Sequence, residues 1–171
     1  RAIYANVEAA QAAREDVPAA MEAIVYELVE RAKFALNDAP LSEGSRDMTQ
    51  RVAVHAMLAH TFTVLAERSP VPLVVLLDEV DSLVGDTLIS VLRQIRSGYD
   101  KRPQRFPQSV VLCGVRDVRD YRLRTDDGKA VITGGSAFNI KAKSLRLGNF
   151  SQDEIAALYQ QHTDATGQAF A

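Results

Sequence analysis

Two adjacent carboxylates, Asp78 and Glu79, directly follow a run of five apolar residues, 73–77. The run is rich in Val and Leu and comes after Pro70 and Pro72, which is typical of a strand buried on both faces inside a parallel sheet. Such a strand ends at the carboxyl edge of the sheet, where open α/β sheets bind ligands. Negative charge there is costly unless a cation or a proton-transfer role accompanies it. The pair therefore indicates a binding or catalytic site, the alternative being a strand that simply ends at solvent.

A second apolar run, residues 109–115, also ends in charge, at Arg116 and Asp117. Between the two runs, apolar residues recur at helical spacing from residue 87 to residue 95, with Asp86 as the predicted N-cap. A helical crossover of this length between two strands predicts that the strands are parallel and lie next to each other in the sheet. Both charged ends should therefore lie at the same edge of the sheet.

The remaining segments supply the elements that must position these residues. Two further strands are predicted at residues 1–8 and 143–147, and the expected fold is a three-layer α/β domain with a mainly parallel sheet flanked by helices. One helix should begin near Asp16 and end at residue 36, and a second should cover residues 47–68. The predicted buried face of the second comprises Val52, His55, Ala56, Ala59, Phe62, Thr63 and Ala66. Ser151 and Glu154 form a capping box that opens a last helix.

Composition limits the class of protein. The chain has 171 residues, a net charge of −2 and one cysteine, Cys113, so it has no internal disulfide, and a reducing cytoplasm is expected. No apolar run approaches the roughly 20 residues that span a bilayer, so no membrane association is expected. Residues 1–90 hold 7 Lys and Arg against 14 Asp and Glu, whereas residues 91–171 hold 13 against 8. This asymmetry indicates an anionic partner for the second part, such as a nucleotide or a nucleic acid.

The apolar run ending in Asp78 and Glu79 resembles the Walker B motif of P-loop ATPases, specifically the AAA+ and STAND type in which Asp is followed by Glu. The resemblance implies that Asp78 holds Mg²⁺, often through water, and that Glu79 polarises the water that attacks the γ-phosphate of ATP. The strand at residues 109–115 is similar to the sensor-1 strand of the family, which implies nucleotide-binding and catalytic roles for Arg116. The family usually has Asn, Thr or Ser at that position.

The order of the elements resembles that of the family over nearly the whole chain. In particular, the run from residue 77 through residues 114–122, with residues 134–140 and 145–150, looks like bacterial AAA-like ATP-binding proteins. The resemblance implies that residues 1–150 form a partial ATPase core and that residues 151–171 begin its helical lid. The phosphate-binding P-loop, Gly-x-x-x-x-Gly-Lys-Ser/Thr, does not occur in the sequence. We therefore expect it just upstream of residue 1 in a longer protein, and we expect these 171 residues to be inactive alone.

Three functions remain open. The first is an ATP-hydrolysing core that uses ATP and Mg²⁺. The second is a nucleotide-responsive switch or scaffold with little or no hydrolysis, which acts as a homo-oligomer or with a partner protein. In this case an arginine would reach the nucleotide of a neighbouring subunit. The candidates are Arg93 and Arg96, or Arg119, Arg122 and Arg124. The third, nucleic-acid binding, is disfavoured because the basic residues alternate with Asp and aromatic residues are few.

Overall fold

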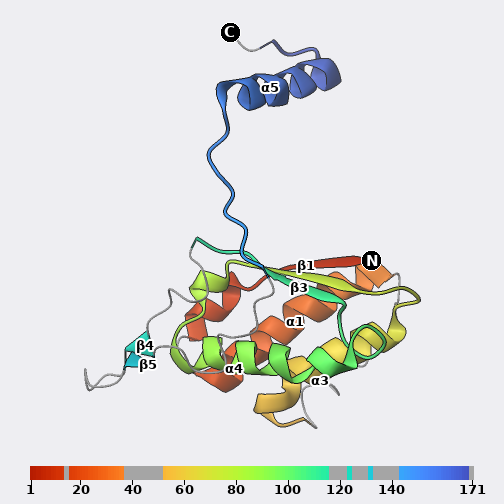
Figure 1. Cartoon of the computed structure of the whole chain (residues 1–171), viewed down its shortest axis with the longest axis vertical. Helices are drawn as coiled ribbons and strands as arrows, with labels where there is room; N and C mark the ends of the chain where they lie inside the picture. Colours follow the sequence, from red (N-terminus) through yellow and green to blue (C-terminus); the bar gives the residue numbers. More distant parts are fainter. Residues whose placement is uncertain (14–15, 37–51, 116–122, 125–130, 133–142, 170–171) are drawn as a thin grey trace. The chain divides into compact units, whose positions relative to one another are not determined.

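The computed structural model describes residues 1–13, 16–36, 52–115, 123–124, 131–132 and 143–169 (Figure 1). The chain divides into two units, Arg1–Lys141 and Ala142–Ala171. Each unit is described by itself below.

The first unit contains a parallel sheet of three strands. The order across the sheet is β1-β2-β3, with bounds Ala2–Asn6, Val74–Asp78 and Ser109–Leu112. In the register, Val75 of the middle strand lies between Ile3 and Val110. The parallel arrangement of the two apolar runs is therefore confirmed, as is the mixed α/β class. Two short strands, β4 (Leu123–Arg124) and β5 (Val131–Ile132), form a separate antiparallel pair.

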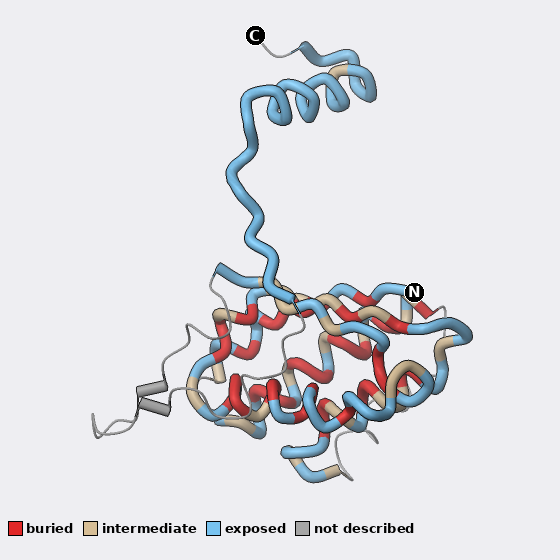
Figure 2. Tube along the Cα trace, viewed as in Figure 1, coloured by how far each residue is buried: buried red, intermediate tan, exposed pale blue. Residues whose placement is uncertain are grey.

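Three long helices pack against one side of this sheet (Figure 1). They are α1 (Val17–Leu36), α3 (Val54–Arg68) and α4 (Gly85–Ser97), and short 3₁₀ helices occur at η1 (Glu8–Ala13), η2 (Val80–Ser82) and η3 (Tyr99–Lys101). Side chains alternate between the two faces of a strand, so one set in β1 and β2 points toward the helices. That set comprises Ile3, Ala5, Val75 and Leu77, all fully buried (Figure 2).

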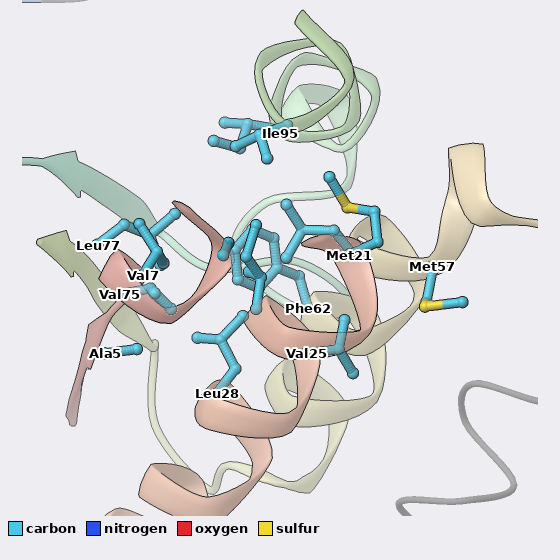
Figure 3. Close-up of a cluster of buried hydrophobic side chains, with 14 of the residues drawn as sticks. Ala5, Val7, Met21, Val25, Leu28, Met57, Phe62, Val75, Leu77 and Ile95 are labelled. Atoms are coloured by element: carbon cyan, nitrogen blue, oxygen red, sulfur yellow. The ribbon is translucent and has the colours of Figure 1, made fainter. Parts of the chain in front are cut away.

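Phe62 of α3 lies at the centre of the core between the strands and the helices (Figure 3). Its ring meets the ring of Phe106 edge to face, with 5.4 Å between centroids. Phe106 in turn lies against Gly98, the residue that ends α4. A Cβ atom at Gly98 would lie 2.1 Å from the Phe106 ring, so only glycine fits there without a shift of the ring.

The opposite face of the sheet is only partly covered. Val74 and Leu76 of β2 are half-buried, and on the neighbouring strands Tyr4 is 47% exposed and Val111 41% exposed. The prediction that the 73–77 run is buried on both faces is therefore wrong for this face. A third layer covering it is not seen in the part of the chain that the structure describes.

The structure confirms the predicted helix at α1 and contradicts the predicted start of α4. The apolar stripe of α1 is buried as its periodicity indicates, and the Asp16 carboxylate caps the helix by accepting a bond from the Ala19 N–H at 3.1 Å. In α4, by contrast, Asp86 lies within the first turn, because the helix begins at Gly85, whose φ of +53° suits glycine. The predicted N-cap role of Asp86 is therefore wrong.

The predicted buried face of the second helix is right at Phe62 and Ala66 and wrong at its other positions. The residues that α3 buries are Met57, Leu58, Thr61, Phe62, Leu65 and Ala66. His55 and His60 are both exposed. A weakly amphipathic helix with Ala on several sides allows more than one inward stripe, so packing against α1 and α4 decides the choice.

In the second unit, residues 143–150 have no regular secondary structure and are exposed. The strand predicted at residues 143–147 is therefore wrong. A strand needs a neighbour for its backbone groups, and no described strand pairs with it. The capping box is confirmed: α5 (Gln152–Thr166) begins with the Ser151 side chain accepting from the Glu154 N–H and the Glu154 side chain accepting from the Ser151 N–H. Gly167 ends the helix in the left-handed conformation.

Candidate functional site

The carboxyl ends of the three parallel strands converge on the turn that follows β2. The Val7 N–H donates to the carbonyl of Asp78 at 3.0 Å, and the Val80 N–H donates to the carbonyl of Cys113 at 3.0 Å. A further bond joins the Cys113 N–H to the carbonyl of Leu77 at 2.8 Å. The turn is therefore held by backbone hydrogen bonds from β1 on one side and from the end of β3 on the other.

Both oxygens of the Asp78 carboxylate accept hydrogen bonds. The hydroxyl of Tyr4 on β1 donates to Oδ2 at 2.7 Å, and the Glu79 N–H donates to Oδ1 at 3.0 Å. The bond to Asp78 also raises the pKa of the Tyr4 phenol, and partial desolvation and the charge of Asp78 add to the rise. Asp78 is half-buried, so its carboxylate still faces solvent in part.

Glu79 adopts a backbone conformation that is unusual for a residue with a side chain. Its φ and ψ are 58° and 38°, in the left-handed region, where Cβ crowds the following carbonyl. Such conformations persist where the surrounding structure enforces them, and they cluster at functional sites. Here the backbone bonds on either side of Glu79 enforce it, and the side chain is left exposed at the edge of the sheet.

Negative charge accumulates around Glu79. The charge of Asp81 is the largest cause that raises the pKa of Glu79, followed by partial desolvation and then by the charges of Asp78 and Glu8. A carboxylate with a raised pKa is a better proton acceptor near neutral pH than an ordinary one. The same crowding of charge would be relieved by a bound cation.

Asp81 is fixed by the segment that follows β3. Its Oδ1 atom accepts a hydrogen bond from the Val115 N–H at 3.1 Å. A Cβ atom at Gly114 would lie 2.5 Å from the same oxygen, so glycine at that position allows the close approach. Cys113 lies beside the turn, and desolvation, followed by the charge of Asp78, raises the pKa of its thiol.

The described residues contain no set of three or more His, Cys, Asp or Glu side chains that could hold a metal ion on their own. Mg²⁺ does not need one, since it retains several waters and takes one or two carboxylates together with substrate phosphates. The donors at this edge are hard oxygen ligands, and the partly exposed Asp78 carboxylate meets the requirement of such an ion. The chemistry of the donor set therefore fits Mg²⁺ bound chiefly through Asp78.

The predicted site residues have different outcomes. Asp78 and Glu79 lie together at the carboxyl edge of the sheet, whereas Arg116 lies outside the described residues. Arg93 and Arg96 are exposed on α4. Sequence reasoning missed two members of the site, Tyr4 and Asp81. Tyr4 could be found only with the register of β1 on β2, which the residue pattern does not give.

Comparisons of the chain with models of protein families, with curated proteins and with solved structures found no match. Among the described helices, none has the length and apolar character needed to cross a bilayer.

Proposed function

We propose that the chain is part of an ATP-binding and ATP-hydrolysing core in which Asp78 binds Mg²⁺ and Glu79 activates water. The phosphate-binding loop would come from sequence not contained in the 171 residues. The proposal rests on the resemblance of the 73–79 segment to a Walker B motif. One structural observation supports it above the others: a strained Glu79 follows Asp78 at the carboxyl end of the middle strand of a parallel sheet.

The roles of the two carboxylates follow from their surroundings. Asp78 is held by hydrogen bonds to both oxygens and would bind the cation directly or through water. The bound Mg²⁺ would neutralise phosphate charge during phosphoryl transfer. Glu79 is exposed and has a raised pKa, so it would orient a water molecule and accept its proton. Arg116 would contact the γ-phosphate.

The first test is calorimetric titration with ATP·Mg²⁺. A longer form of the protein that includes a P-loop should bind the nucleotide, and Asp78→Asn should weaken binding at least tenfold. Asp86→Asn is the matched control, because it removes one exposed carboxylate from the first turn of α4. Equal affinity of the Asp78→Asn and Asp86→Asn variants would contradict the metal role of Asp78.

The second test is turnover. Glu79→Gln should leave ATP binding intact and slow hydrolysis by 10²-fold or more, as loss of a general base does. If the unaltered protein binds ATP and hydrolyses it no faster than Glu79→Gln, Glu79 is not the base. Nucleotide-dependent assembly without turnover would then favour a switch or scaffold.

A further inference from the structure

The hydrogen bond between Tyr4 and Asp78 crosses from one strand to the next on the partly covered face of the sheet. In the parallel register, Tyr4 lies opposite Leu76 and Asn6 lies opposite Asp78. Tyr4 therefore reaches Asp78 diagonally, over a separation that a long aromatic side chain can bridge. Its hydroxyl arrives at Oδ2 at 2.7 Å, the normal length of an O–H···O bond to a carboxylate.

This contact adds a second restraint on the orientation of the Asp78 carboxylate. An aspartate at the end of a strand can rotate about χ1 and χ2, and the Glu79 N–H bonds only its Oδ1 atom, at 3.0 Å. The Tyr4 hydroxyl bonds the other oxygen from a different strand. With both oxygens held from separate segments, the carboxylate keeps one orientation before any ligand arrives, and each oxygen retains a lone pair.

Packing alone does not explain a tyrosine at this position. Tyr4 is 47% exposed, and phenylalanine would cover the same half-buried Leu76 equally well. The hydroxyl is the only part of the side chain that contacts Asp78 as a donor. Groups that hydrogen-bond a metal-binding carboxylate orient it, and their loss typically weakens metal binding 10- to 100-fold.

We propose that Tyr4 is a positioning residue for Asp78, holding its carboxylate in the orientation that binds a divalent cation. The inference rests on the proposed function, because it takes Asp78 as the metal ligand. Tyr4 thereby joins the site from the first strand. It neither contacts the nucleotide nor takes part in proton transfer.

The test uses Tyr4→Phe with Tyr26→Phe as the matched control, since Tyr26 is an exposed tyrosine on α1. The first readout needs no metal: three-bond NMR couplings report whether the Asp78 side chain keeps one χ1 rotamer. The second is titration with Mn²⁺ alone, followed by the relaxation of water protons. Tyr4→Phe should average the Asp78 rotamers and weaken Mn²⁺ binding about tenfold, whereas Tyr26→Phe should change neither.

Two results would overturn the inference while leaving the proposed function standing: a single Asp78 rotamer in Tyr4→Phe, or averaged rotamers with unchanged Mn²⁺ affinity. An Asp78→Asn variant separates the two proposals. If it binds Mn²⁺ as tightly as the unaltered chain, Asp78 is not the metal ligand. If the 171 residues bind no Mn²⁺, the titration is repeated on the longer form with ATP, whose phosphates supply further ligands, and absence of binding there leads to the same conclusion. The proposed function and the inference then fail together. In that case, a change of Asp78 rotamers in Tyr4→Phe would show only that the Tyr4 contact orders the side chain.

Discussion

The side-chain carbonyl of Gln94 on α4 accepts a hydrogen bond from the backbone N–H of Leu58 on α3, at 2.8 Å. The same oxygen accepts from the Ala59 N–H at 3.2 Å, and the Gln94 amide nitrogen donates to the carbonyl of Val54 at 3.2 Å. Gln94 is 3% exposed. One buried carboxamide therefore bonds three backbone groups of a neighbouring helix, and α3 has no side-chain cap of its own.

Gln94→Leu should lower the free energy of unfolding by about 2 kcal/mol, because it leaves the Leu58 and Ala59 N–H groups and the Val54 carbonyl without this partner. Urea denaturation measures the loss, and hydrogen exchange should quicken most at the Leu58 amide. Gln104→Leu, at an exposed glutamine, is the control. Equal stability of the two variants would mean that α3 satisfies these groups without Gln94.

Gly98→Ala should destabilise the first unit by about 3 kcal/mol, since the new methyl group would lie 2.1 Å from the buried Phe106 ring. Adding Phe106→Leu should restore part of the loss, which separates a packing clash from a backbone effect. Gly148→Ala should have no effect, because an added Cβ there meets nothing within 4 Å. Thermal unfolding of these proteins and of Phe106→Leu alone tests this prediction, and a double variant whose loss equals the sum of the two single losses would contradict the clash.

Glu79→Gln should stabilise the protein at neutral pH. The pKa of Glu79 is raised in the folded chain, chiefly by the charge of Asp81, so the folded state binds the Glu79 proton more tightly than the unfolded state does. The stability linked to this proton is complete below the unfolded pKa and is lost as the pH rises through the folded pKa. The advantage of Glu79→Gln should therefore vanish on acidification. Unfolding curves across this range test it, with Glu22→Gln, at an exposed glutamate of α1, as control.

Glu79→Gly should stabilise more than Glu79→Gln does. Both variants remove the charge, but only glycine also relieves the left-handed backbone conformation at φ 58°. The difference in melting temperature between the two variants therefore reports the relief of this conformation minus the added flexibility that glycine gives the unfolded chain. A glycine variant no more stable than the glutamine variant would mean that the relief does not exceed this cost.

The start of α5 should respond to pH in the opposite sense. The hydrogen bonds from the backbone N–H and the side chain of Ser151 lower the pKa of Glu154. The helix stability linked to a depressed carboxylate pKa is present above the unfolded pKa and is lost as the pH falls through the folded one. NMR shifts of the first turn should therefore show fraying in acid. Glu154→Gln should abolish the pH response, and an unchanged response in that variant would assign it to another group.

Much of the fold follows from local patterns in the sequence. The apolar runs identify β2 and β3, and the stripe of α1 is continuous enough to fix both its buried face and its extent. The failures occur where tertiary contacts decide. The sequence pattern predicts Val74 and Leu76 as core residues, yet among the described residues no layer of helices covers that face of the sheet. Gln94 interrupts an apolar stripe, and only the backbone of α3 makes its burial favourable.

The candidate site likewise contains residues that the sequence predicts and residues that only the tertiary structure reveals. Adjacent carboxylates at the end of an apolar run could be recognised from the sequence, because topology brings the carboxyl ends of parallel strands to one edge. The Tyr4 contact depends on strand register, and the Asp81 contact depends on a glycine at position 114 that lets the chain approach closely. Neither property is encoded in a local pattern of residue types.

The pairing of Ala2 with Val74 in the β1–β2 register also constrains how the domain forms. β1 has no other partner in the described sheet, so during synthesis it must wait until β2 has left the ribosome. Contacts this distant in sequence slow folding, because a long loop must close before they contribute. Among the described helices, α1 follows β1 in the chain and packs against its apolar face, with Ile3 and Ala5, before β2 is made. The earliest stable intermediate should therefore be a pair of helices, α1 and α3, onto which the sheet assembles last.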